Sequence, residues 1–197
     1  MDTNKTIKET AITGSVSIDE LANLKNINEI DNNVYLVLDD LVFCTATEEH
    51  VREVAELWAN LASIQQVFAP QRYDFKQEEK NWQNIVRKKL AKKNNLLLVV
   101  HKKEHNEVRG FLYLQTITLP SSNLVLKGVI EDIYTKPQYR KQNIANQLLD
   151  ISLEWAFNQN IKQVDLVSIS NIRDTTTFYL NYLKKTKSDV NLQLVTI

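Results

Sequence analysis

Glycine is scarce in this chain of 197 residues and occurs only at Gly14, Gly110 and Gly128. Phosphate loops of the glycine-rich type need several glycines close together, because their backbones pass very near the phosphates. The sequence therefore excludes the glycine-based nucleotide-binding motifs as a class. Any phosphate site in this chain must be built from other residues.

Cysteine is rarer still, with Cys44 as the single example. One cysteine excludes an intrachain disulfide and is typical of a reducing compartment. It ends the apolar run 41–44, which predicts a buried and unreactive thiol. The histidines show no metal-ligand spacing with one another or with Cys44, so we expect no metal site. They are His50, His101 and His105.

The chain also lacks an apolar stretch long enough to span a membrane, and residues 1–9 lack the apolar core of a signal peptide. Lysine and arginine number 24, and aspartate and glutamate also number 24. This balance gives no sign of a nucleic acid or anionic membrane partner. We expect a cytoplasmic protein that binds no membrane and is unlikely to bind nucleic acid. Its length of 197 residues fits one compact domain, either alone or with an extension.

The hydrophobic pattern predicts a mixed α/β chain. A polar connection at 102–107 indicates an antiparallel hairpin, and a strand–helix–strand order over 124–169 indicates a parallel crossover unit. Strands are expected at 34–38, 41–45, 96–101, 108–119, 124–135, 163–169 and 191–197. Helices are expected at 19–26, from Thr47 to just before Pro70, and at 77–92, 144–158 and 175–185.

The helix expected at 77–92 has one strongly basic side. We expect this side to face solvent, which is the usual role of a charged helix face. The alternative is a docking surface for an acidic partner or RNA, whose binding would then depend strongly on salt. The basic residues are Arg87, Lys88, Lys89, Lys92 and Lys93.

The most informative segment is 130–145. A β-branched strand stops before Pro137, and a short polar turn leads into an amphipathic helix that begins near Ile144. The first amides of a helix have no intrahelical partner, and the helix dipole adds partial positive charge there. Arg140 and Lys141 place two cations beside these amides. Such a site suits a pyrophosphate.

This segment resembles the acyl-CoA signature of the GNAT superfamily of N-acetyltransferases, which reads roughly hydrophobic-x-Val-x-Pro-x-Tyr-Arg overlapping Arg/Gln-x-x-Gly-x-Gly/Ala. Asn143 stands where that family has glycine, which permits a positive φ and a close approach of the phosphates. Asparagine is the side-chain-bearing residue that best tolerates this region, so we expect the turn to be kept. The matching residues are Ile133, Thr135, Pro137, Tyr139, Arg140, Asn143 and Ala145.

The order of elements extends the resemblance over residues 41–197 and leaves 1–40 as an N-terminal extension without an assigned role. It implies the GNAT fold, an α/β (mixed, α+β-like) architecture. In this fold a central, mostly antiparallel mixed sheet is flanked by helices and contains the strand–helix–strand acyl-CoA unit. A homodimer is possible, because dimers are common in this superfamily.

The resemblance also implies acetyl-CoA as acyl donor and assigns residues to it. A bulged strand would bind the pantetheine arm, and the amides that open the next helix would hold the pyrophosphate beside Arg140. Asn171 would complete the cofactor site. Tyr179 would protonate the departing thiolate, with Tyr182 as the second choice. The remaining residues implied for cofactor binding are Ile133, Tyr134, Thr135, Lys141, Gln142, Asn143, Ile144 and Ala145.

The amine also needs a group that accepts its proton, and Glu131 and Asp132 are the candidates. Successive strand residues point to opposite faces, so regular geometry brings only one of them to the substrate side. The pair resembles the Glu-Asp run of polyamine and diamine acetyltransferases. We favour Glu131 as the base or amine-orienting carboxylate, with Asp132 second. The alternative for either residue is an ordinary structural acid.

We therefore expect an N-acetyltransferase that moves an acetyl group to a primary amine by direct attack, without a covalent enzyme intermediate. The expected acceptor is a small cationic amine, polyamine-like or aminoglycoside-like, and Glu78 and Glu79 are further acids that could hold it. Two alternatives stay open. One is a non-catalytic module of the same fold that binds CoA or a protein partner. The other is an enzyme that acetylates protein or tRNA.

Overall fold

The computed structural model describes residues 33–68, 79–104, 107–119, 125–169 and 172–197. They belong to one compact unit, Asp31–Ile197. The helix expected at 19–26 and residues Glu78 and Asn171 lie outside the described residues. The strands are β1 (Val34–Leu38), β2 (Leu41–Thr45), β3 (Leu96–Lys102), β4 (Val108–Leu119), β5 (Val125–Thr135), β6 (Gln163–Ser168) and β7 (Asn191–Thr196). The helices are α2 (Val51–Phe68), α3 (Glu79–Leu90), α4 (Ile144–Asn158) and α5 (Arg173–Lys185), with 3-10 turns η1 (Glu48–His50) and η3 (Pro137–Tyr139).

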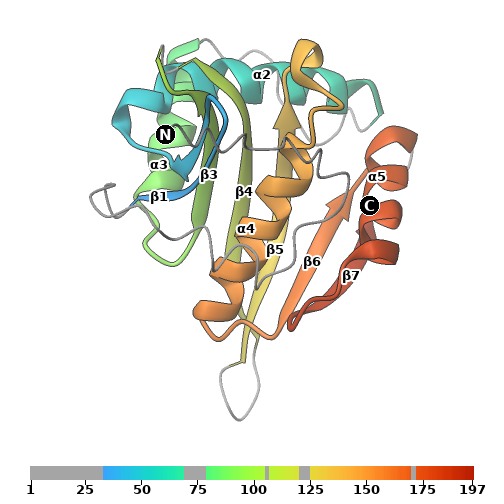
Figure 1. The fold of residues 1–197 in the computed structure, drawn as a ribbon. Coiled ribbons are helices and arrows are strands. Elements are labelled where there is room, and N and C mark those ends of the chain that lie inside the picture. Colours follow the sequence, from blue (N-terminus) through green and yellow to red (C-terminus); the bar gives the residue numbers. More distant parts are fainter. Residues whose placement is uncertain (1–32, 69–78, 105–106, 120–124, 170–171) are drawn as a thin grey trace, which may run out of the picture. The chain divides into compact units, whose positions relative to one another are not determined.

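The described strands form one seven-stranded sheet in chain order, β1 to β7 (Figure 1). Neighbours from β1 to β5 are antiparallel, whereas β6 is parallel to β5 and β7 is parallel to β6. The predicted hairpin is therefore confirmed as β3–β4. The predicted parallel crossover is confirmed as β5–α4–β6. These connections establish the mixed sheet expected from the sequence.

The first strand, β1, lies before residue 41, the expected start of the domain. β1 pairs antiparallel with β2, from Leu38 opposite Leu41 to Val34 opposite Cys44. The turn between them contains Asp39, whose φ of 52° lies in the left-handed region. Residues 34–38 thus form one of the two edge strands of the described sheet, and β7 forms the other.

Helices cover both faces of the sheet. α2 packs on β4 and β5 and α3 against β3, while α4 covers β3, β4 and β5, and α5 packs on β6 and β7. Figure 1 shows α4 and the α2–α3 pair on opposite faces. On the α2–α3 face, the Trp58 ring lies 4.8 Å from that of Phe111 and 5.7 Å from that of Tyr113, measured between centroids. No helix within the described ranges is both long and apolar enough to cross a bilayer.

Candidate active site

The pairing of β4 with β5 contains a β-bulge at Glu131. Tyr113 lies opposite Asp132 and Leu114 opposite Ile130, so Glu131 is the extra residue. The expectation that only one carboxylate reaches the substrate side assumed regular strand geometry, and the bulge interrupts the alternation of faces. Both side chains turn toward the α2–α3 face, where Glu131 bonds Lys89 of α3 and Asp132 bonds Trp58 of α2.

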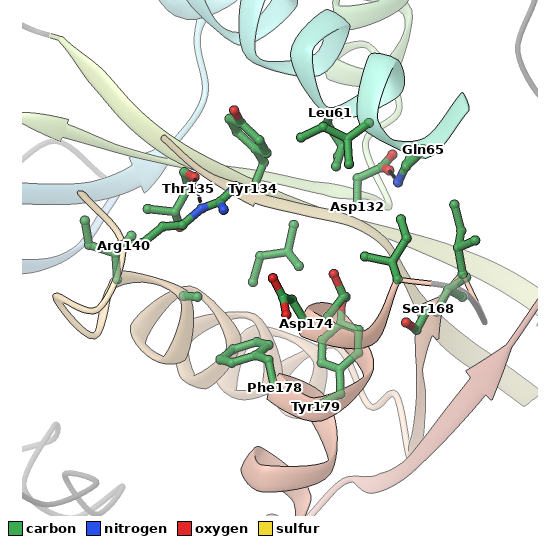
Figure 2. Close-up of a pocket in the computed structure, with 18 of the residues that line it drawn as sticks. Leu61, Gln65, Asp132, Tyr134, Thr135, Arg140, Ser168, Asp174, Phe178 and Tyr179 are labelled. Carbon is green, nitrogen blue, oxygen red and sulfur yellow. Dashed lines mark hydrogen bonds between the residues drawn. The ribbon is translucent and has the colours of Figure 1, made fainter. Parts of the chain in front are cut away.

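Beyond the bulge, β5 separates from β6. Their parallel pairing covers only 127–130 of β5 and 163–166 of β6, although the strands continue to Thr135 and Ser168. The unpaired ends line a cavity of about 600 Å³, which Figure 2 shows between α2, β5 and α5. The β5 residues in its wall include Ile133, Tyr134 and Thr135. The strand edge that the sequence predicted for an extended ligand therefore faces this cavity.

The turn after β5 forms the other end of the cavity. Lys141 has φ 63°, and Asn143 has φ 61° and ψ 4°, so the predicted left-handed asparagine is confirmed. Among the described residues, the amides of 142–146 find no backbone acceptor. The Asn143 side chain accepts a hydrogen bond from Asn146 Nδ2 at 2.5 Å and does not cap its own helix. The unbonded amides are thus available to a ligand.

Most residues predicted for the cofactor line this cavity. Arg140, which donates from Nε to the Thr135 carbonyl at 3.3 Å, forms part of the wall. Gln142 belongs to the turn but is not among the lining side chains. The lining residues between β5 and the first turn of α4 are Tyr139, Arg140, Lys141, Asn143, Ile144 and Ala145.

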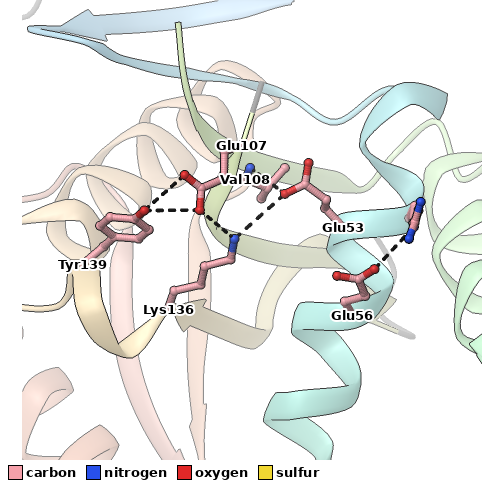
Figure 3. Close-up of polar contacts among 7 residues, drawn as sticks. Glu53, Glu56, Glu107, Val108, Lys136 and Tyr139 are labelled. Atoms are coloured by element: carbon pink, nitrogen blue, oxygen red, sulfur yellow. Dashed lines mark hydrogen bonds and ion pairs between the residues drawn. The ribbon is translucent and has the colours of Figure 1, made fainter. Parts of the chain in front are cut away.

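A polar network fixes the start of this turn (Figure 3). Glu107 accepts hydrogen bonds from Tyr139 Oη at 3.1 Å and Lys136 Nζ at 3.1 Å. Glu53 of α2 lies 3.9 Å from Lys136 Nζ and accepts the Val108 amide at 3.0 Å. Burial opposes ionisation of Glu107, but the hydrogen bonds from Lys136 and Tyr139 hold its pKa below the ordinary value. The network ties the turn to β4 and α2.

Asp132 is an acid of the cavity wall that accepts hydrogen bonds from two side chains of α2. Its Oδ2 accepts a hydrogen bond from Trp58 Nε1 at 3.0 Å, and its Oδ1 accepts one from Gln65 Nε2 at 3.4 Å. Burial raises the pKa of Asp132, and the charge of Glu131 adds to this effect. Lys89 and the two hydrogen bonds oppose it. A carboxylate with a raised pKa is a better proton acceptor than an ordinary one.

Glu131 is held in an ion pair. Its Oε2 lies 2.9 Å from Lys89 Nζ, and the same ammonium lies 3.7 Å from the Tyr113 ring centroid and 4.9 Å from that of Trp58. The expectation of a fully solvated basic helix face is therefore wrong at Lys89, because aromatic rings and a carboxylate draw it inward.

Tyr179 lies on α5 and is 1% exposed. Its hydroxyl points into the cavity (Figure 2). Burial, and then the charge of Asp132, raise the pKa of Tyr179, so the phenol keeps its proton at neutral pH. Tyr182, the second choice of the sequence, instead donates to Asp150 Oδ1 of α4 at 2.5 Å and does not line the cavity.

Sequence reasoning missed several cavity residues. Gln65 of α2 is one of them, and its amide donates to Asp132 Oδ1, a contact between residues far apart in the sequence. Asp174 lies in the first turn of α5, where an acid has an ordinary helix-stabilising role, so its position gave no functional signal. The other lining residues not foreseen are Leu61, Ile64, Asn146, Val167, Ser168, Ile169, Ile172, Thr175, Phe178 and Ile197.

The structure also assembles a cluster that the residue spacing did not show. Ligand atoms of Cys44, His50 and His101 all lie within 4.8 Å of one another. However, His50 Nδ1 accepts the Thr47 amide at 3.0 Å, so the proton of the neutral ring is on Nε2. Burial and then the charge of His101 lower the pKa of His50, which favours this neutral form. A protonated nitrogen offers no lone pair to a metal.

Several solved structures are similar to this fold. Similar solved structures include a predicted acetyltransferase with acetyl-CoA from Clostridium acetobutylicum (20% identity, TM-score 0.55, covering 71% of this chain and 88% of that chain). They also include an aminoglycoside antibiotic 6'-N-acetyltransferase from Acinetobacter baumannii (12%, 0.56, 72% and 88%). A third is a ribosomal-protein-alanine N-acetyltransferase from Brucella melitensis biovar Abortus (16%, 0.55, 72% and 89%).

At these identities the structural likeness shows the fold alone, and no curated protein sequence matches the chain. The family model described as acetyltransferase (GNAT) family matches residues 58–179, which is more than half of the chain. The match includes the bulge, the splayed strand, the turn and Tyr179. The chain therefore belongs to the acetyltransferase (GNAT) family.

Proposed function

We propose that this protein transfers the acetyl group of acetyl-CoA to a primary amine by direct attack. The observation that carries the proposal is that one cavity combines three features. They are an unpaired edge of β5, a helix start with unbonded amides beside two cations, and Asp132 near Tyr179. The first two suit a pantetheine arm and a pyrophosphate, and the third suits proton transfer.

The residues present fit acetyl-CoA. The left-handed Asn143 gives the turn the conformation that glycine provides in the family, and the buried Thr135 Oγ1 has no hydrogen-bond partner within the described part of the chain. The β5 edge at 133–135 would hold the pantetheine arm, and the amides of 142–145 with Arg140 and Lys141 would hold the pyrophosphate. When bound, acetyl-CoA supplies an activated acyl group as a thioester.

Asp132 is the proposed proton acceptor for the amine. An alkyl amine has a pKa near 10.4, so only about one molecule in two thousand is neutral at pH 7, a cost of roughly 4–5 kcal/mol. A nearby carboxylate lowers this cost by taking the proton in the cavity, directly or through water. We place Asp132 before Glu131, reversing the order that the sequence favoured, because Lys89 already pairs with Glu131.

Tyr179 is the proposed proton donor. Its hydroxyl is protonated at neutral pH and lies in the same cavity as Asp132. It is therefore placed to give its proton to a departing thiolate. In this arrangement Asp132 on β5 would accept a proton, and Tyr179 on α5 would donate one from another wall of the cavity.

The charges of the cavity wall support a small cationic amine as acceptor. The lining cations of the described residues, Arg140 and Lys141, belong to the phosphate turn, whereas the acids Glu131, Asp132 and Asp174 belong to the strand and helix walls. Apolar side chains that line the same cavity suit the carbon chain of a polyamine-like or aminoglycoside-like substrate. A homodimer and a cytoplasmic location stay predictions of the sequence.

Calorimetric titration with acetyl-CoA and with CoA tests the cofactor site. We expect micromolar binding, and weaker binding when Arg140 and Lys141 are both replaced by alanine. Lys162→Ala, at the opposite end of β6 from the cavity, is the matched control. A panel of amines, scored by thiol release, then identifies the acceptor. No binding at millimolar cofactor would refute the enzyme proposal and favour a non-catalytic module.

A further inference from the structure

Lys89 occupies an unusual position for a lysine on a basic helix. Its side chain is 21% exposed, whereas that of Arg87, also in the last turn of α3, is 45% exposed. The ammonium lies over the rings of Tyr113 and Trp58, at 3.7 and 4.9 Å from their centroids. Aromatic faces attract a cation because their π-electrons are negative. Side chains from α2 and β4 therefore hold this ammonium below the surface.

The same ammonium contacts the bulge of β5. Lys89 Nζ lies 2.9 Å from Glu131 Oε2, and Glu131 is the extra residue of the bulge. The Trp58 ring that Lys89 covers also donates its Nε1–H to Asp132. Lys89 is thus in contact with one carboxylate of the bulge and with the ring that binds the other.

We propose that Lys89 is a positioning residue for acetyl transfer, an inference that rests on the function proposed above. Its ammonium fixes Glu131 at the bulge and keeps Asp132 ionised, so that Asp132 is the carboxylate able to take the proton of the amine. Lys89 itself is not among the residues that line the cavity. It acts through the two acids.

The groups that face Asp132 come from every element packed around it. α2 provides the hydrogen-bond donors Trp58 and Gln65, and β5 provides the negative charge of Glu131. Tyr113 on β4 stays neutral, since burial raises its pKa to about 12, and Tyr179 on α5 is neutral as well. Within the described residues, Lys89 is the one cation whose charge acts on Asp132.

Without Lys89, two like charges would share the bulge. Two carboxylates at one site do not both ionise readily, and one of them takes up a proton. Burial already favours the protonated form of Asp132, so Asp132 would become protonated at a higher pH than in the wild type. A protonated acid cannot accept the proton of the amine, so transfer would begin to fail at a higher pH than in the wild type.

The indole of Trp58 provides a direct probe of this effect. Its Nε1–H bonds Asp132, so its NMR resonance should move when Asp132 takes up a proton. We expect the midpoint of this titration to rise by about one pH unit in Lys89→Met, the size expected for loss of a nearby opposite charge. Lys89→Arg should restore the wild-type midpoint. Lys88→Met, which removes an exposed lysine one residue away, is the matched control and should cause no shift.

If Lys89→Met fails to fold, Glu131→Gln provides a second test, in which the titration midpoint of Asp132 should shift in the opposite direction. Removing the like charge should lower the midpoint of Asp132. Equal midpoints in wild type and Lys89→Met, or in wild type and Glu131→Gln, would overturn the proposal. The NMR titration needs no activity, so it separates this proposal from the proposed function.

Kinetics provide the second readout. In Lys89→Met we expect the acid limb of the pH profile of kcat/KM for the amine to move to higher pH by the same shift as the Trp58 titration midpoint. Transfer should recover at higher pH, and the KM for acetyl-CoA should be unchanged. A uniform loss at every pH would refute positioning through charge. Loss of transfer in Glu131→Gln, with an unshifted Trp58 signal, would make Glu131 the base.

Discussion

Replacement of Asp132 by asparagine tests the proposed chemistry most directly. The change keeps the shape of the side chain and one acceptor oxygen, while Trp58 Nε1 and Gln65 Nε2 now compete for that oxygen. It removes the carboxylate that would take the amine proton. General-base catalysis contributes about 10²- to 10⁴-fold, so kcat at pH 7 should fall by that factor, or by about 3–5 kcal/mol in activation free energy.

The pH dependence of the variant gives the sharper result. Without a base in the cavity, the rate should follow the free-amine fraction, which rises tenfold per pH unit until the amine pKa near 10.4. Thiol release at saturating acetyl-CoA and amine, measured from pH 6 to 9, tests this slope. Affinity for acetyl-CoA should not change, since Asp132 is not among the proposed cofactor contacts.

Asp174→Asn is the matched control in the same cavity. Its carboxylate is exposed and belongs to a different element, α5, so we expect a higher KM for a cationic amine and a nearly unchanged kcat. The proposed role of Asp132 is refuted if Asp132→Asn keeps kcat within a few-fold of the wild type at pH 7. A large loss of kcat in Asp174→Asn alone would indicate that Asp174 of α5, and not Asp132, is the proton acceptor.

Three further predictions concern single residues. Tyr179→Phe should lower kcat in the thiol-release assay with little change in acetyl-CoA affinity. A wild-type rate in this variant would show that Tyr179 contributes only to packing. Asn143→Gly should leave acetyl-CoA affinity unchanged in calorimetry or improve it, and weaker binding would show that the asparagine side chain contacts the cofactor. The same change should alter the free energy of unfolding by about 1 kcal/mol or less, because relief of the left-handed strain opposes the greater entropy of the unfolded chain. The pKa of His50 is lowered in the folded protein, so the unfolded chain binds more protons below about pH 6.5. The stabilisation from this residue is therefore present above that pH and is lost as pH falls. His50→Gln should flatten this part of the plot of unfolding free energy against pH, and an unchanged plot would contradict the lowered pKa of His50.

The local elements of the site were predictable because local patterns determine them. The apolar stripe of 144–158 predicted α4 with both ends correct, and the β-branched run before Pro137 predicted β5. Asn143 was expected in the left-handed region from its own conformational preference, and it lies there. Resemblance to a known family then assigned roles to these residues, which the pattern alone could not do.

The sequence by itself determined the order of elements, the mixed sheet, and the turn that opens α4, since each depends on residues close together in the chain. Only the tertiary structure decided how the acids are arranged. The bulge at Glu131 arises from the pairing of β5 with β4, and the inward turn of Lys89 arises from rings on α2 and β4. These contacts join residues far apart in sequence, and no local periodicity records them. They are the reason why we propose Asp132, and not Glu131, as the carboxylate that accepts the proton of the amine.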